Sequence, residues 1–340
     1  MNTPDAVQAK LVTALADIKP RKLDLPVSNR VALKRTLDAA EYYLDIYRSA
    51  LERMLAMCGK SPDEIIIVDY GGGHGLLSIL AKMLDFRSVV YVDHDAEALT
   101  TARLLGDALG VQPDVMLQGD ASTLKTWCSE NRVIPNGLLA MDVIEHVYIL
   151  DDFFACLHEI SPRMKMVLTT ASTPYNHRVV RRLHKAMQAD ELGTTVKKGF
   201  WQMRRDYIQA MQSEMSDREL DYWADNTRGL IYSDIERAVE SQSPNLLLDP
   251  YNTCDPATGS WTERILPIDD YRQILQPYGF RLSVLPGRYN EHRHGPKLWI
   301  SRRYNSIIDK APAEEPRNIR ERRRYRKALR VAPYICLVVE

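Results

Sequence analysis

The chain has 340 residues, and its 45 Lys and Arg residues balance 45 Asp and Glu residues, so the formal net charge at pH 7 is zero. This balance excludes an overall field that would attract nucleic acid or an anionic membrane, and such a partner would have to use a local patch. The five cysteines are scattered without a C-x-x-C pair, which argues against a disulfide framework or a zinc site. Because no apolar run reaches about 18 residues and the N-terminus lacks an apolar h-region, we expect a cytoplasmic protein with no membrane partner.

The order of the predicted elements indicates an α/β fold. Apolar residues recur at helical spacing within residues 1–60 and predict an N-terminal helical cap. After a break at Ser61-Pro62, short strands rich in β-branched residues alternate with helices through residues 61–177. This alternation predicts a doubly wound, Rossmann-like core with a mostly parallel sheet and helices on both faces.

Residues 178–266 interrupt the strand rhythm and are predicted to form a helical lid inserted into the core. The aromatic residues of this segment would either line an acceptor pocket or form the core of the lid itself. Residues 267–340 are expected to complete the core sheet with a helix and two strands. The basic residues of the inserted segment, which would suit an anionic acceptor, are Arg178, Arg181, Arg182, Lys197, Lys198, Arg204 and Arg205.

A basic helix is predicted near the end of the chain, over residues 317–330. Its positive charge would suit a phosphate backbone. The run also contains Glu321 and only one aromatic residue, Tyr325, which is more typical of a solvated surface helix. We therefore rank nucleic acid below a small molecule as the partner, and the sequence leaves a homo-oligomer open.

A glycine-rich turn joins the first predicted strand of the core to its first helix. Asp69 stands at the end of the strand, and Gly71, Gly73 and Gly75 follow with G-x-G-x-G spacing, whereas a dinucleotide fingerprint would need glycine at Leu76. Glycine allows close approach to a ligand, and the following helix N-terminus offers free N–H groups to a carboxylate. The turn therefore favours a ligand with a carboxylate over a nicotinamide dinucleotide. The alternative is a tight turn with a structural role only.

Acidic residues also stand at the predicted ends of the next strands. Asp93 ends SVVYVD about 20 residues after the glycine turn, where a carboxylate accepts the hydrogen bonds of a ribose diol. Asp120 ends VMLQGD and Asp142 ends LLAMDV. Each alone would be an ordinary solvated carboxylate, but the series, which begins with Asp69, indicates a nucleoside site along one edge of the sheet.

Residues 60–175, and more loosely 260–340, resemble the class I S-adenosylmethionine-dependent methyltransferases. VDYGGGHG resembles the first motif of that family, YVDHD its ribose-binding strand end, and LQGDAS the strand end that meets adenine. DVIEHV, with the later VLTTASTPYN, is similar to the O-methyltransferases of ubiquinone biosynthesis. The resemblance implies a seven-stranded sheet with an antiparallel last strand and S-adenosylmethionine as the cofactor. The cofactor-binding residues that it implies are Asp69, Gly71, Gly72, Gly73 and Gly75 for the methionine moiety, Asp93 for the ribose, Asp120 and Ala121 for the adenine, and His94 and Asp142 beside them.

Glu145 and His146 follow the fourth predicted strand and are the candidate catalytic residues. His146 is the candidate base, because a histidine has a suitable pKa for taking a proton from a hydroxyl or ammonium group. The alternative is that the pair only braces the next helix. A further hypothesis combines this pair with Asp142 and His177 as ligands of a divalent metal, as in relatives with an E-x-x-E-H pattern. The metal itself stays unassigned.

These patterns predict an S-adenosylmethionine-dependent methyltransferase that acts on an oxygen or nitrogen atom of a small molecule or a biosynthetic intermediate, with anionic compounds and glycan precursors among the candidates. Two alternatives stay open. One is a nicotinamide-dependent oxidoreductase, and the other is a binding protein that keeps the methyltransferase fold without catalysis.

Overall fold

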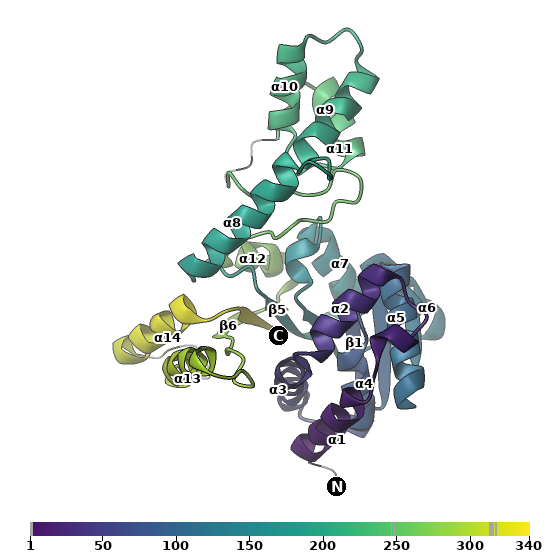
Figure 1. Cartoon of the computed structure of the whole chain (residues 1–340), viewed down its shortest axis with the longest axis vertical. Coiled ribbons are helices and arrows are strands. Elements are labelled where there is room, and N and C mark those ends of the chain that lie inside the picture. Colours follow the sequence, from purple (N-terminus) through teal and green to yellow (C-terminus); the bar gives the residue numbers. More distant parts are fainter. Residues whose placement is uncertain (1–2, 246, 248, 313–315, 317) are drawn as a thin grey trace.

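The computed structural model describes residues 3–245, 247, 249–312, 316 and 318–340. Its centre is a seven-stranded sheet in the order β3-β2-β1-β4-β5-β7-β6 (Figure 1). The first five strands are parallel, and β7 is antiparallel to both of its neighbours. This confirms the predicted fold class, including the antiparallel last strand. The strands are β1 (Ile66–Tyr70), β2 (Ser88–Asp93), β3 (Val115–Gln118), β4 (Gly137–Met141), β5 (Lys165–Thr170), β6 (Leu282–Pro286) and β7 (Ile335–Val339).

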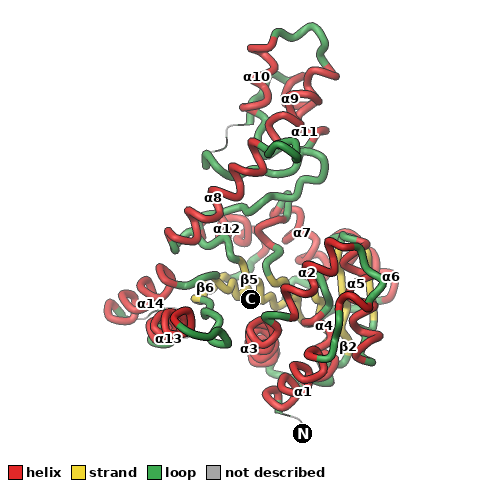
Figure 2. Tube along the Cα trace, viewed as in Figure 1, coloured by secondary structure: helices red, strands yellow, loops and turns green. Residues whose placement is uncertain are grey.

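Hydrophobic cores on both faces of the sheet explain the continuous apolar runs of the central strands. Successive side chains of a strand point to opposite faces, so Ile67 packs with the N-terminal helices while Val68 packs on the other face. Figure 2 shows the strands in yellow between the two groups of helices. One core involves α1 (Pro4–Ala16), α2 (Val27–Leu37), α3 (Ala40–Cys58), α4 (Leu76–Met83) and α5 (Ala96–Leu109), and the other α6 (Ala121–Asn131), α7 (Leu150–Ile160) and α12 (Ile268–Leu275).

The segment between β5 and α12 projects from the sheet as a helical arm (Figure 1). Its helices are α8 (His177–Leu192), α9 (Phe200–Met211), α10 (Asp217–Asn226) and α11 (Tyr232–Glu240). Trp223 and Tyr207 pack with Ile208, Leu220 and Ile235, so these aromatic residues serve the core of the arm. A return loop, residues 249–267, leads back to the sheet.

Four of the basic residues that we predicted to bind an anionic acceptor are instead used inside the arm. Arg204 is fully buried and its Nη2 lies 2.5 Å from Oε1 of Glu191. Arg205 pairs with Asp217 and Asp221, Lys197 with Asp190, and Lys198 with Asp206. Because these four residues already have carboxylate partners, the structure gives no support to the expectation that they bind an anionic acceptor.

A helical hairpin lies between β6 and β7. It consists of α13 (Pro296–Ile308) and α14 (Ile319–Val331), which meet through Ile308 and Ala328. The hydroxyl of Tyr325 donates to the carbonyl of Val284 at 2.5 Å and ties α14 to β6. The basic residues of α14 are exposed, as expected of a solvated helix, and position 317 of the predicted basic run is outside the described residues. No helix in the described ranges has the length and hydropathy of a membrane-spanning segment.

Candidate functional site

A pocket of about 150 Å³ lies where the glycine turn meets the N-terminal helices, and we call it the glycine-loop pocket. It brings together four of the predicted residues, Asp69, Gly71, Gly72 and Gly73. Gly75, also predicted, does not line the pocket and is the N-cap of α4. The remaining lining residues come from the N-terminal helices, the start of α4 and the end of β4, namely Thr36, Tyr43, Tyr47, His74, Leu76, Leu77 and Met141.

Two glycines of the turn are required for different reasons. Both have left-handed backbone angles, with φ of 65° at Gly71 and 53° at Gly73. A Cβ atom at Gly71 would lie 2.4 Å from Cγ2 of Val143, so the backbone packs against its neighbour there. A Cβ atom at Gly73 would meet no described atom within 4 Å. Gly73 therefore keeps space open at the pocket.

Asp69 anchors the turn to the first turn of α4. Its side chain is 2% exposed, and its Oδ2 accepts hydrogen bonds from Ser78 N at 3.0 Å and Ser78 Oγ at 2.7 Å. Burial outweighs these hydrogen bonds and raises the pKa of Asp69 to about 7. The N-terminus of α4 is thus held beside the pocket, where its free N–H groups suit a carboxylate.

Asp93 lies at the end of β2, next to the pocket but outside its lining. Its Oδ2 accepts the N–H of Gly73 at 2.9 Å, and its Oδ1 accepts the N–H of Asp95 at 3.0 Å. Each carboxylate oxygen has two lone pairs, so each keeps one for a further donor such as a ribose hydroxyl. His94 is exposed, and its Nδ1 lies 3.6 Å from Oδ1 of Asp93.

Asp120 and Ala121 lie at the next strand end, where α6 begins. Asp120 caps the helix, and its Oδ1 accepts hydrogen bonds from Ser122 N at 2.9 Å and Thr123 N at 3.1 Å. Partial burial acts to raise the pKa of Asp120, but these hydrogen bonds prevail and lower it. The carboxylate therefore stays charged, and its charge adds to the larger effect of burial in raising the pKa of Tyr70.

A larger cavity of about 550 Å³ adjoins the glycine-loop pocket, with which it shares Tyr43, Tyr47 and Met141. We call it the tyrosine cavity. Its walls come from α3, the ends of β4 and β5, the start of α8, the loop after β6 and the residues before β7. The other lining residues are Tyr42, Ile46, Asp142, Thr169, Ala171, Asn176, Arg178, Val179, Arg182, Tyr289, Asn290, Arg293, Pro333 and Tyr334.

Asp142 faces the tyrosine cavity rather than the glycine-loop pocket. It has a φ of 56°, an uncommon angle for a residue other than glycine and one that is often found at functional sites. Its N–H donates to the carbonyl of Thr169 at 3.0 Å, which holds this conformation. Asp142 itself is exposed, but the protein packed around its carboxylate and repulsion from Glu263 raise its pKa to about 6, against the opposing effect of His146.

Glu263 also affects the site, although no sequence pattern predicted it as a site residue. It lies in the return loop of the arm, and its Oε2 accepts the hydroxyl of Ser172 at 2.6 Å. No motif connects the return loop to the end of β4, so only the fold brings Glu263 near Asp142.

Glu145 and His146 line neither of the two cavities. Glu145 is 1% exposed, and its Oε1 accepts the N–H of Ala171 at 3.2 Å while its Oε2 has no partner among the described residues. Burial raises the pKa of Glu145 well above its usual range. His146 Nδ1 lies 2.7 Å from the carbonyl oxygen of Trp261, and the backbone of Glu145 accepts the N–H of Arg264 at 3.1 Å. In the structure the pair holds the return loop, whereas the alternative that we expected to a catalytic role was bracing of the next helix.

The predicted metal ligands are not assembled into a metal centre. Within the described ranges, no group of three or more His, Cys, Asp and Glu side chains is arranged to hold a metal ion. Asp142, Glu145, His146 and His177 therefore do not form the site that the E-x-x-E-H comparison implied.

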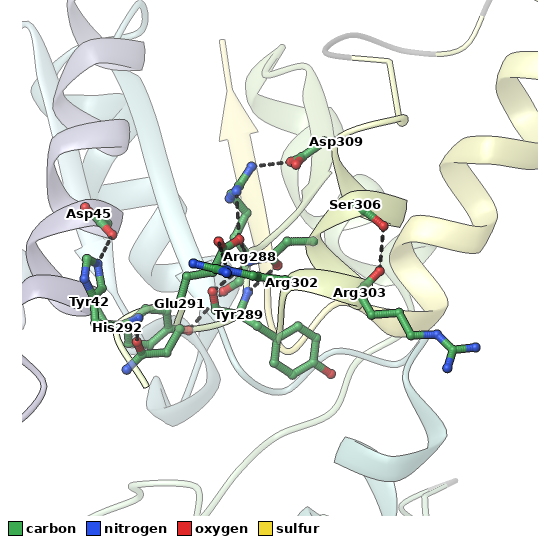
Figure 3. Close-up of polar contacts among 12 residues, drawn as sticks. Tyr42, Asp45, Arg288, Tyr289, Glu291, His292, Arg302, Arg303, Ser306 and Asp309 are labelled. Carbon is green, nitrogen blue, oxygen red and sulfur yellow. Dashed lines mark hydrogen bonds and ion pairs between the residues drawn. The ribbon is translucent and has the colours of Figure 1, made fainter. Parts of the chain in front are cut away.

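The loop after β6 lines the tyrosine cavity with Tyr289, Asn290 and Arg293, and Figure 3 shows its polar contacts with α3. The hydroxyl of Tyr42 donates to the carbonyl of Arg288 at 3.1 Å. His292 lies between two carboxylates of α3, with Nδ1 2.7 Å from Glu41 and Nε2 2.7 Å from Asp45. One wall of the cavity is thus a loop that side chains of the N-terminal cap hold in place.

The tyrosines of α3 were not predicted as site residues. Tyr42, Tyr43, Ile46 and Tyr47 occupy one face of the helix, and that face lines the tyrosine cavity, although Tyr47 also packs against the core on the N-terminal side of the sheet. Hydroxyl-bearing aromatic residues on one face were a usable signal, but helical spacing alone does not tell a cavity wall from a core.

No family model and no curated protein matches the sequence. Among solved structures, a protein assigned as a methyltransferase from Bacillus halodurans is 13% identical over 86% of this chain and 97% of its own, with a TM-score of 0.39. A protein assigned as an S-adenosylmethionine-dependent methyltransferase from Listeria monocytogenes is 12% identical over 84% of this chain and 96% of its own, with a TM-score of 0.36. A protein from Pyrococcus horikoshii is 21% identical, and the match spans 44% of this chain and 64% of that one, with a TM-score of 0.32. At these identities and TM-scores, the function has to be argued from the residues of this chain.

Proposed function

We propose that the chain is an S-adenosylmethionine-dependent methyltransferase that modifies an oxygen or nitrogen atom of a small molecule. One observation carries the proposal. The glycine-loop pocket meets the tyrosine cavity at Tyr43, Tyr47 and Met141, and Asp142 lines the second cavity. A cofactor site and an acceptor site that share a wall place the two reactants side by side, as direct group transfer requires.

The residues around the glycine turn fit the parts of S-adenosylmethionine. The α4 N-terminus beside Asp69 suits the carboxylate of its methionine moiety, and the free lone pairs of Asp93 suit the ribose diol. Asp120 at the next strand end suits the adenine amino group. When bound, S-adenosylmethionine supplies a methyl group that is already activated by the positive charge on sulfur.

Asp142 is the candidate base in this proposal, in place of His146. It lines the acceptor side, and its raised pKa of about 6 keeps it ionised near neutral pH while making it more basic than an ordinary aspartate. It would take the proton from a hydroxyl or ammonium acceptor. The DVIEHV segment, which resembles ubiquinone-biosynthesis enzymes, contributes both this aspartate and the bracing pair, so O-methylation is the first reaction to test.

The nicotinamide-dependent oxidoreductase fits less well. The dinucleotide-binding sheet has the strand order 3-2-1-4-5-6, whereas here the antiparallel β7 lies between β5 and β6. The third glycine of that fingerprint is replaced by Leu76, which begins α4.

Ligand-dependent thermal unfolding tests the cofactor. S-adenosylhomocysteine and NAD would each be added at about 100 times a micromolar dissociation constant, which stabilises a binding protein by about 2.7 kcal/mol. We expect S-adenosylhomocysteine to raise the unfolding midpoint and NAD to leave it unchanged. A shift with NAD alone would contradict the proposal. If S-adenosylhomocysteine binds but labelled S-adenosylmethionine transfers no methyl group to any metabolite of a cell extract, the non-catalytic binding protein is the better description.

A further inference from the structure

Three arginines line the tyrosine cavity, and they come from two separate segments. Arg178 and Arg182 lie four residues apart in the first turns of α8, so they share one face of that helix. Arg293 comes from the loop after β6, on the other side of the cavity. The fold therefore gathers three positive charges at one cavity from elements that are far apart in the sequence.

These arginines have no carboxylate partner within the described part of the chain. The contrast with other arginines is clear, since Arg204 pairs with Glu191 and Arg288 pairs with Asp309 and Glu291. Arg178 is positioned by a hydrogen bond from its Nη1 to the hydroxyl of Tyr304 at 2.9 Å. All three arginines are exposed at the cavity, Arg178 is held there by Tyr304, and none has its charge compensated by a carboxylate among the described residues.

The arginine charges affect the pKa of two tyrosines in the walls of the cavity. Burial raises the pKa of Tyr289, and Arg178 and Arg182 oppose that rise. Burial likewise raises the pKa of Tyr42, and Arg293 opposes it. The two tyrosines therefore lie within the field of the arginines.

From this arrangement, and resting on the proposed function, we propose that the methyl acceptor carries a carboxylate or phosphate group that Arg178, Arg182 and Arg293 bind in the tyrosine cavity. The nucleophilic hydroxyl or amine of the acceptor then points toward Asp142, the residue after Met141 of the wall shared with the glycine-loop pocket. Arginine suits this role because its planar fork matches the oxygens of both anions. The tyrosine rings provide flat surfaces for the body of the acceptor.

Binding of small probes tests the proposal without knowledge of the acceptor. Dissociation constants of phenyl phosphate, benzoate and benzyl alcohol would be measured by ligand-observed NMR on the full chain, saturated with S-adenosylhomocysteine. We expect at least one of the two anions to bind about tenfold or more tightly than the neutral alcohol, and to weaken as salt is raised. The comparison of phosphate with carboxylate tells the two anion types apart.

Matched variants locate the binding. Arg182→Gln and Arg293→Gln should each weaken the anion by about tenfold, since each removes a charged hydrogen-bond donor. Arg181→Gln is the control, because Arg181 is an exposed neighbour on α8 that does not line the cavity. All three variants should bind S-adenosylhomocysteine with unchanged affinity.

The outcomes separate the two proposals. If S-adenosylhomocysteine binds but neither anion binds more tightly than benzyl alcohol, or Arg181→Gln weakens the anion as much as Arg182→Gln, the anion site is overturned and the methyltransferase proposal stands. If S-adenosylhomocysteine does not bind, the methyltransferase proposal fails, and the acceptor role of the cavity fails with it even where the anion binds through Arg182 and Arg293.

Discussion

Glu263, in the return loop of the arm, raises the pKa of Asp142, at the end of β4. The two carboxylates lie close enough to repel each other, and this repulsion adds to the effect of desolvation. Asp142 faces the tyrosine cavity, while Glu263 accepts a hydrogen bond from Ser172. The return loop therefore tunes a group of the candidate site, although it contributes no residue to the walls of the cavity.

Replacing Glu263 should lower the pKa of Asp142. In Glu263→Gln the repulsion is lost, so the pKa of Asp142 should fall from about 6 toward its usual range. Carbon-13 NMR titration of the aspartate carboxyl groups, assigned with Asp142→Asn, measures this. Glu240→Gln, on the exposed end of α11, is the control and should change nothing. An unchanged midpoint in Glu263→Gln would show that the two carboxylates do not interact.

Asp142→Asn should slow methyl transfer without affecting cofactor binding. Loss of a general base costs about 10² to 10⁴ in rate. Because the base must be ionised, kcat/KM of the wild type should rise with pH through about 6, and this rise should disappear in the variant. Asp152→Asn, an exposed aspartate of α7, serves as the control. Rates come from labelled S-adenosylmethionine with the acceptor identified in extracts, and a variant with wild-type rates would rule out Asp142 as the base.

Alanine at Gly73 should block the pocket, whereas alanine at Gly59 should only cost stability. Both glycines are left-handed, and a Cβ atom at either would meet no described atom within 4 Å. Each substitution should therefore destabilise the fold by a similar amount, about 1 to 2 kcal/mol. Only Gly73→Ala should weaken S-adenosylhomocysteine, by about tenfold or more, because only Gly73 lines the glycine-loop pocket. Calorimetric binding and denaturant unfolding give the two quantities, and equal affinities in both variants would argue against this pocket.

Asp93 and Asp95 form a matched pair at the end of β2. Asp93→Asn should weaken S-adenosylhomocysteine by about tenfold, because a neutral amide is a poorer acceptor for ribose hydroxyls. Asp95→Asn should keep the affinity, since Asp95 caps α5 through the N–H of Glu97. Isothermal titration calorimetry compares the two. Similar affinities in the two variants would remove Asp93 from the cofactor site.

Stability should fall as pH rises across the range in which Asp69 ionises. Its pKa is raised from 3.8 to about 7 in the folded chain, so between these values the folded state holds a proton that the unfolded state has lost. The contribution of Asp69 to the free energy of unfolding then decreases with pH in that window. Asp69→Asn should make this decrease shallower, whereas Asp24→Asn, an exposed control, should not. Urea unfolding at a series of pH values measures it, and parallel curves for wild type and Asp69→Asn would contradict the assignment.

The sequence predicted the central fold because its signals are local. β-branched runs, helical spacing and the glycine turn are properties of neighbouring residues, and the parallel order of β1 to β5 follows from their alternation with helices. Asp69 and the glycines are likewise adjacent in sequence, so their meeting at one pocket could be foreseen. The antiparallel β7 was foreseen through resemblance to a family rather than from its own residues.

By itself, then, the sequence determined the α/β core and the edge at which Asp69, Asp93 and Asp120 end their strands. Only the tertiary structure decided what lies beyond that edge. It placed Asp142 at the tyrosine cavity, made Glu145 a brace for the return loop, and left Arg182 and Arg293 with no carboxylate partner among the described residues. The physical reason is that pairing and burial depend on contacts between segments far apart in the chain, and neither charge nor spacing within one segment reports which partner the fold supplies.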